Sequence, residues 1–136
     1  PVSCEAALAT LQMIEDEDLL TASTEKGAYV RKRMAKWETQ YDFIGDIRGK
    51  GLSIGIDIVS NRQAKTRDNE AALKICNYAF DHGVIVIAVA GNVLRFQPPL
   101  VITYEELDTA LDVLEEAFEK LTNGELDNYE ISGQGW

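Results

Sequence analysis

Cysteine, proline and histidine are scarce in this 136-residue chain, which has two, three and one of them. Cys4 and Cys76 fall within helix-like apolar patterns and have no second pair beside them, which argues against a disulfide framework or a zinc site. We expect both to be reduced core residues. His82 precedes Gly83 at the end of a helical pattern, where a capping role is favoured over general-base chemistry because no catalytic partner can be assigned. The sequence therefore predicts no metal site.

Positive charge is also in short supply. The 13 Lys and Arg residues face 23 Asp and Glu residues, and the formal net charge of −10 repels phosphate backbones and anionic lipid headgroups. No apolar run approaches the ~20 residues that a membrane-spanning helix needs. The N-terminus lacks the basic and apolar regions of a signal peptide. Nucleic acid and membrane are thus poor partners, and a cytoplasmic location is expected.

The length and apolar content indicate one domain with its own core, since 46% of the residues are hydrophobic. The chain has no initial Met, and Pro1 leads directly into a helical pattern. We therefore expect that the chain begins inside a longer protein.

Apolar residues at steps of three and four predict two helices at the start of the chain, over residues 2–16 and 19–40. Ser3 is a candidate cap for the first. The acidic run 15–18 separates them, because negative charge is unfavourable at the C-terminal end of a helix. A solvated corner is a better explanation of this run than a metal site, which needs ligands at spaced positions.

Strand patterns dominate the middle of the chain. Residues 52–59 alternate between apolar and small or polar side chains, and a helical pattern covers residues 70–81. The continuous apolar run 84–88 predicts a strand near the middle of the sheet. Gly91 and Asn92 then suit a hairpin turn.

A last helix is predicted from Thr103, with Glu106 completing a capping box. The order of the elements is helix, helix, strand, strand, helix, strand, strand, helix. This order predicts an α/β (α+β) fold, a two-layer sandwich with a mostly antiparallel sheet of about four strands and helices on one face.

Arg95 lies inside an apolar strand pattern that Pro98 and Pro99 cut short. The pattern predicts that Arg95 is half-buried at a rim of the sheet, where its planar guanidinium could bind a carboxylate or a phosphate. A structural ion pair, or an edge-strand position with a solvated head group, explains the same pattern from spacing alone.

The segment Asn-Val-Leu-Arg-Phe-x-Pro-Pro-Leu at 92–100, followed by Val-Ile-Thr and Glu-Glu-Leu-Asp, resembles the C-terminal part of the class III aminotransferases. These are pyridoxal-phosphate (PLP) enzymes of fold type I, and they include 4-aminobutyrate aminotransferases. The Arg-Gly-Lys-Gly-Leu segment at 48–52 and the helix that begins at Pro1 are similar to the same family. The resemblance covers nearly the whole chain and implies that Arg95 holds the carboxylate of the substrate.

The resemblance also implies a domain division. Residues 1–122 would form the small C-terminal domain, with 1–18 as a linking helix and 19–122 as the α/β core, and residues 123–136 would be a loosely held tail. The family is dimeric, so a homodimer is implied for the full-length protein. The implied reaction transfers an amino group from 4-aminobutyrate or a similar amino acid to a 2-oxo acid such as 2-oxoglutarate.

PLP chemistry requires a Schiff-base lysine and an acid opposite the pyridine nitrogen. The resemblance places both, with most phosphate contacts, in a large domain upstream of Pro1, so this chain would hold no catalytic or cofactor-binding residue and would be inactive alone. No lysine here has a recognisable Schiff-base context: Lys26, Lys32 and Lys36 belong to a helix face, Lys50 and Lys65 to turns, and Lys74 and Lys120 to polar helix positions.

A second interpretation remains open. The chain could be a free-standing α/β module that binds a small acid or a protein through the rim of its sheet, without catalysis.

Overall fold

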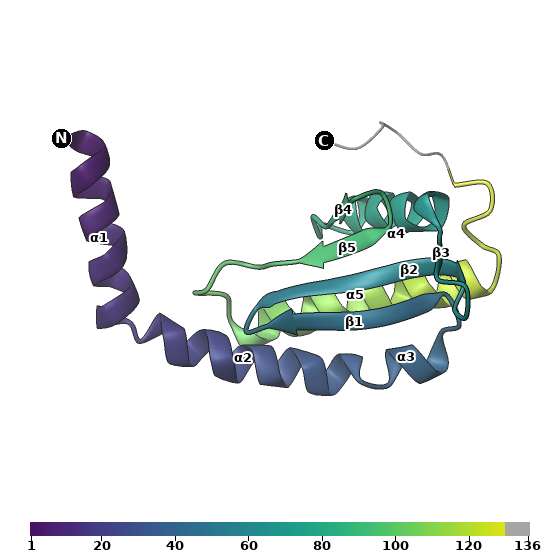
Figure 1. The fold of residues 1–136 in the computed structure, drawn as a ribbon, viewed down its shortest axis with the longest axis horizontal. Coiled ribbons are helices and arrows are strands. Elements are labelled where there is room, and N and C mark those ends of the chain that lie inside the picture. The colour runs from purple at the N-terminus through teal and green to yellow at the C-terminus, as the bar shows by residue number, and fades with distance from the viewer. Residues whose placement is uncertain (130–136) are drawn as a thin grey trace.

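The structure of the protein is a computed structural model that describes residues 1–129. Its strands hydrogen-bond in the order β1-β2-β5-β4, with β3 added beside β2, and all the pairs are antiparallel (Figure 1). The elements are α1 (Val2–Asp16), α2 (Leu19–Met34), α3 (Trp37–Gln40), β1 (Ile44–Lys50), β2 (Ser53–Asn61), β3 (Thr66–Arg67), α4 (Asn69–Asp81), β4 (Ile87–Val89), β5 (Val93–Phe96) and α5 (Tyr104–Thr122).

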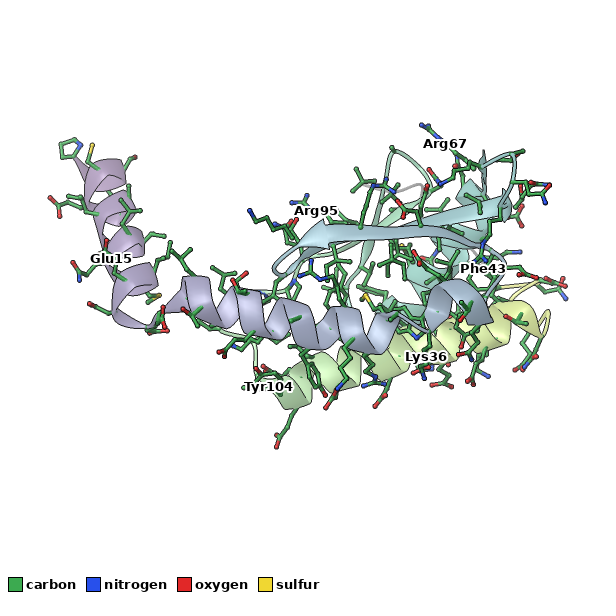
Figure 2. The ribbon with its side chains drawn as sticks, turned by 60° about the horizontal axis from the view of Figure 1, so that its bottom comes forward. Glu15, Lys36, Phe43, Arg67, Arg95 and Tyr104 are labelled. Atoms are coloured by element: carbon green, nitrogen blue, oxygen red, sulfur yellow. The ribbon has the colours of Figure 1, made fainter. Side chains whose placement is uncertain are left out.

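One face of the sheet is covered by helices and the other face is open. The alternation of β2 turns Ile54, Ile56 and Ile58 toward the helices, where all three are buried. They pack with the apolar stripes of α2, α4 and α5 in a single core, and α2 and α5 lie on the same side of the sheet (Figure 2). The predicted sandwich is therefore confirmed.

Aromatic side chains fill the end of the core near α3. The Trp37 and Phe118 rings meet edge to face with centroids 5.1 Å apart, and Tyr41 contacts Phe118 in the same way at 5.4 Å. The predicted helix 19–40 is interrupted after Met34, so it forms α2 and α3. The interruption is slight, because Ala35 and Lys36 keep right-handed helical dihedral angles.

The helix α1 stands apart from the core. It ends at Asp16 and α2 begins at Leu19, so the predicted break at the acidic run is confirmed, and Asp18 has a left-handed φ of 49° there. No residue of α1 is buried, and the helix projects from the end of α2 (Figure 1). Two predictions are wrong here: Ser3 lies inside the helix without capping it, and Cys4 is exposed rather than in the core.

The hairpin of β4 and β5 differs from the prediction. The run 84–88 lies at the edge of the sheet, because β5 pairs with β2 and leaves β4 outermost. Its alternate side chains point away from the core, so Val86 is buried but Ile85 is 77% exposed. Ala90 and Gly91, rather than Gly91 and Asn92, take the positive φ angles of the turn.

Residues 123–129 return to pack beside α4 and α5. Leu126 is buried, the Lys74 ammonium donates to the Asp127 carbonyl at 3.2 Å, and the Tyr129 hydroxyl hydrogen-bonds to Asp81. Lys74 was predicted at a polar helix position, but this contact buries it. Residues 130–136 of the predicted tail lie outside the described residues. No helix within 1–129 is both long and apolar enough to cross a membrane.

Candidate carboxylate-binding site

Arg95 is presented by the middle of β5. Its neighbours Leu94 and Phe96 point into the core, so alternation turns Arg95 to the open face of the sheet. This placement corrects the prediction of a half-buried side chain, since Arg95 is exposed (Figure 2). Across the strands, Arg95 pairs with Gly55 of β2 and Ile87 of β4. Gly55 adds no side chain of its own to the open face, and a methyl group of Val93 lies 3.1 Å from the position that a Cβ of Gly55 would take.

The charges around Arg95 leave it available to a ligand. Within residues 1–129, no Asp or Glu side chain forms an ion pair with Arg95. Arg48 lies in the same row of the open face, but its guanidinium is 2.9 Å from Asp46 and 3.8 Å from Asp57. The structural ion pair that the sequence left open thus has no partner for Arg95 in this part of the chain.

Arg33 shows what a structural arginine looks like in this fold. It joins α2 to α5 through Asp108 at 3.0 Å, Asp112 and Glu115, and the hydrogen bond to Asp112 is the main cause that raises its pKa further. Its charge is therefore already compensated. Arg95 differs from Arg33 in two ways: it has no ion-pair partner among residues 1–129, and it is exposed whereas Arg33 is half-buried.

A groove of about 550 Å³ lies beside Arg95, between the end of β5 and the start of β4. The strand β5 ends at Phe96, as Pro98 and Pro99 predict. Most of the walls of the groove are apolar, and Gln97, Glu106 and Thr109 add polar groups. A carboxylate on Arg95 would thus have an apolar surface next to it. The apolar lining comes from Val84, Ile85, Val86, Ile87, Phe96, Pro98, Pro99, Ile102 and Ala110.

Asn92 fixes the hairpin that carries Arg95. It is buried, and its amide donates to the Asp57 carboxylate at 2.6 Å and to the Ile58 carbonyl at 2.9 Å. The sequence pattern places Asn92 in the turn and does not reveal this role. An amide that directly precedes a buried apolar strand was the available signal, because a buried amide requires hydrogen-bond partners.

The lysines of residues 1–129 do not line the groove. Lys50 lies in a neighbouring hollow with Ser53 and Gln97. Lys74 is buried, but its ammonium is held by Glu70 at 2.8 Å and by the Asp127 carbonyl. Residues 1–129 therefore provide no lysine placed to bind the cofactor beside Arg95.

His82, the other candidate for chemistry, caps a helix. His82 is the C-cap of α4, its Nδ1 lies 2.8 Å from the Tyr78 carbonyl oxygen, and its ring stacks on Tyr78. Gly83 follows with a φ of 82°, so the predicted capping role is confirmed. No group of three or more His, Cys, Asp or Glu side chains in 1–129 is arranged to hold a metal ion.

Comparisons with known proteins point to one family. The sequence profile of the family described as Aminotransferase class-III matches residues 1–118. The chain is 47% identical to the isoleucine 2-epimerase of Lentilactobacillus buchneri over 137 residues, covering 100% of this chain and 30% of that protein. It is 37% identical to a probable 4-aminobutyrate aminotransferase of Bacillus subtilis over 117 residues, covering 85% and 27%.

A solved structure agrees with the fold. The amine transaminase of an uncultivated Pseudomonas species, in a PLP-bound form, superposes with a TM-score of 0.81 at 32% identity, over 88% of this chain and 28% of that one. The chain thus spans less than a third of the length of each of these proteins.

Proposed function

The chain belongs to the class III aminotransferase family, and from this membership we propose that the whole protein is a PLP enzyme that transfers the amino group of an amino acid to a 2-oxo acid. One observation carries the proposal for this segment: Arg95 is an exposed arginine without an ion-pair partner among the described residues, beside an apolar groove. The cofactor's lysine lies, in this proposal, on polypeptide outside these 136 residues. The isolated chain is therefore proposed to be inactive.

Arg95 would act by orientation. A guanidinium binds a carboxylate through two parallel hydrogen bonds, which fixes the direction as well as the position of the substrate. Holding the acid end in place presents the amino end to the reacting group, and such positioning is a large part of catalysis. The hydrogen bonds of Asn92 keep the hairpin, and thus Arg95, in register.

For the amino donor, we propose 4-aminobutyrate or a similar amino acid, with 2-oxoglutarate as the acceptor. The similarity to the probable 4-aminobutyrate aminotransferase supports this choice. A homodimer and a cytoplasmic location complete the proposal and rest on the family alone. The free-standing acid-binding module is the competing interpretation.

Inversion of the amino-bearing carbon is a second candidate reaction. The identity to the isoleucine 2-epimerase is higher than that to the 4-aminobutyrate aminotransferase, 47% against 37%. The apolar walls of the groove also suit an amino acid with an apolar side chain. This reaction removes a proton from the carbon and returns one on the opposite face, so it needs no 2-oxo acid.

Product analysis of the full-length protein with PLP separates the candidates. Incubation with 4-aminobutyrate and 2-oxoglutarate should yield glutamate if amino transfer is correct. Incubation with L-isoleucine alone should yield D-allo-isoleucine, detected by chiral chromatography, if inversion is correct. If neither product forms and no bound PLP absorbs visible light, the free-standing module is favoured.

The Arg95→Ala variant tests the role of the arginine in either reaction. Loss of a hydrogen-bonded ion pair costs about 1.5–3 kcal/mol, so KM should rise by about 10- to 150-fold. The free energy of unfolding should change by less than about 0.5 kcal/mol, because Arg95 is exposed. Arg67→Ala, at the far end of the sheet (Figure 2), is the matched control and should alter neither. If Arg95→Ala unfolds the domain, Arg95 is a structural residue.

A further inference from the structure

The loop that joins β5 to α5, residues 97–102, has little of its own to hold it in place (Figure 1). The ladder of β5 ends at Phe96, and Pro98 and Pro99 have no N–H group to donate. Inside the loop, the Ile102 N–H donates to the Pro99 carbonyl at 3.0 Å and closes a turn. This bond is local, so it fixes the shape of the loop but not its place on the domain.

One hydrogen bond ties the loop to another element. The Lys26 ammonium of α2 donates to the Leu100 carbonyl at 3.3 Å, and Lys26 is half-buried. Among residues 1–129, no other hydrogen bond joins residues 97–102 to a different helix or strand. Leu100 and Ile102 also pack against the core, but apolar contacts are not directional. The direction of the loop therefore depends on Lys26.

Lys26 is itself held on a fixed part of α2. The next residue, Gly27, is buried against the backbone of Gly51, and the Leu52 N–H donates to the Ser23 hydroxyl at 3.4 Å. Both contacts join α2 to the turn between β1 and β2, so this stretch of the helix is fixed relative to the sheet. Lys26 thus links the loop after β5 to the same sheet that presents the arginine.

Lys26 also acts on the start of α5. The pKa of Glu106 is lowered first by its hydrogen bonds from Thr103, and the charge of Lys26 lowers it further. Thr103 and Glu106 form the capping box at which α5 begins, directly after the loop. The same ammonium therefore stabilises the loop and the first turn of the helix that follows it.

The loop forms walls of the two hollows near Arg95. Gln97, Pro98 and Pro99 line the groove of about 550 Å³ beside Arg95, and all three also line the neighbouring hollow of about 450 Å³. Lys26 lines neither hollow. A shift of the loop would therefore change the space next to the guanidinium without any contact between Lys26 and a ligand.

We propose that Lys26 is a positioning residue for carboxylate binding: it holds the Leu100 carbonyl and so keeps the loop where the groove beside Arg95 can receive the acid end of the substrate. This inference rests on the proposed function, because it takes Arg95 as the carboxylate-binding residue. Lys26 acts through the backbone of the loop. Its loss should weaken binding of the substrate and leave the rate of the bound complex unchanged.

Lys26→Met in the full-length protein with PLP tests this role, because methionine keeps an apolar stem and removes the ammonium. KM for the amino acid that the wild type converts, 4-aminobutyrate or L-isoleucine, should rise by about 3- to 10-fold, the effect of one hydrogen bond, while kcat stays within about twofold. Lys26→Arg restores a donor and should return KM to the wild-type value. Hydrogen exchange should become faster in the peptide 97–103, where the Ile102 and Thr103 amides are hydrogen-bonded.

Lys36→Met is the matched control, since Lys36 is also a cation beside α2 but pairs with Glu115 of α5 and not with the loop (Figure 2). It should alter neither KM nor the exchange of the peptide 97–103. The proposal is overturned by unchanged KM or unchanged exchange in Lys26→Met, by a rise in KM that Lys36→Met reproduces, or by a rise that Lys26→Arg does not reverse.

Failure of the proposed function would be seen separately. A wild type that converts neither amino acid, or an Arg95→Ala variant with unchanged KM, would contradict the proposed reaction or the role of Arg95. The exchange of the peptide 97–103 does not depend on activity. In that case it decides alone whether Lys26 holds the loop.

Discussion

Gly27 shows how a single residue sets the distance between a helix and the sheet. It is buried on α2, and a Cβ built there would lie 2.3 Å from the Gly51 carbonyl oxygen and 2.4 Å from its carbon. Both atoms belong to the backbone of the turn between β1 and β2, so neither can rotate away. The helix can approach this turn closely only because residue 27 has no side chain.

Gly27→Ala should therefore destabilise the fold by about 1–3 kcal/mol, the usual effect of overpacking. In an exposed helix the same substitution stabilises by about 1 kcal/mol, so the sign of the change is diagnostic. Denaturant unfolding measures it. Ala28→Gly, at the exposed neighbouring position, is the control and should lose only the propensity difference of about 1 kcal/mol. A more stable Gly27→Ala would show that α2 does not pack on the turn.

The helix α5 is an element whose start is fixed by local chemistry. The Thr103 hydroxyl accepts from the Glu106 N–H at 3.2 Å, and the Glu106 carboxylate accepts from the Thr103 N–H at 2.8 Å. The backbone hydrogen bond from Thr103 is the main cause that holds the pKa of Glu106 below its ordinary range. A second hydrogen bond, from the Thr103 hydroxyl, acts in the same direction.

Removal of the capping box should lower stability in a pH-dependent way. Thr103→Ala should cost about 1 kcal/mol at neutral pH. Because the folded pKa of Glu106 is lowered, its stabilising effect is complete above the ordinary glutamate pKa of about 4.3 and is lost as the pH falls through the lower folded pKa. Glu106→Ala should thus be less stable than the wild type at pH 7, and the difference should shrink in acid. Glu105→Ala is the control for the loss of a negative charge near the N-terminus of α5, since Glu105 lies in the same helical turn but outside the capping box. An equal loss of stability in Glu105→Ala and Glu106→Ala would contradict the expectation.

Elements whose signals are local could be predicted from the sequence. The capping box at Thr103, the break at Asp18 and the alternation of β2 depend on neighbouring residues, and all are confirmed. The prediction that the run 84–88 lies near the middle of the sheet was wrong. A strand with apolar side chains on both faces is normally packed against other elements on both faces, but no described residue packs on the open face here.

The candidate site was only partly predictable. Arg95 could be singled out because a charge interrupts an apolar strand. Its exposure follows from the alternation of β5, which turns Leu94 and Phe96 into the core and Arg95 away from it. Asp57, which bonds Asn92, and Asp127, which bonds Lys74, lie 35 and 53 residues away along the chain, so no local pattern could reveal these two contacts.

On the scale of the whole molecule, one core holds all the elements except α1 and the two-residue strand β3. The two cysteines lie on either side of this division. Cys4 is exposed on α1, whereas Cys76 packs against the core, and burial raises the pKa of its thiol to about 11. The thiolate is the reactive form, so at pH 8 only about one Cys76 thiol in a thousand is reactive.

Alkylation should therefore report on the opening of the core. In the native chain, iodoacetamide should modify Cys4 quickly and Cys76 slowly. With urea, the modification of Cys76 should follow the loss of far-UV circular dichroism with the same midpoint, because the core unfolds as a unit. A Cys4→Ser variant isolates the signal of Cys76. Equal rates for the two thiols in the absence of urea would show that α4 opens independently.

The outer margin of β1 has its backbone groups occupied by side chains: the Ile47 N–H donates to Glu38, and Arg31 and Arg62 donate to the Gly49 and Ile44 carbonyl oxygens. A strand from another molecule would need these groups unpaired in order to extend the sheet there. We therefore expect no ribbon or fibril to grow from the β1 side of the domain.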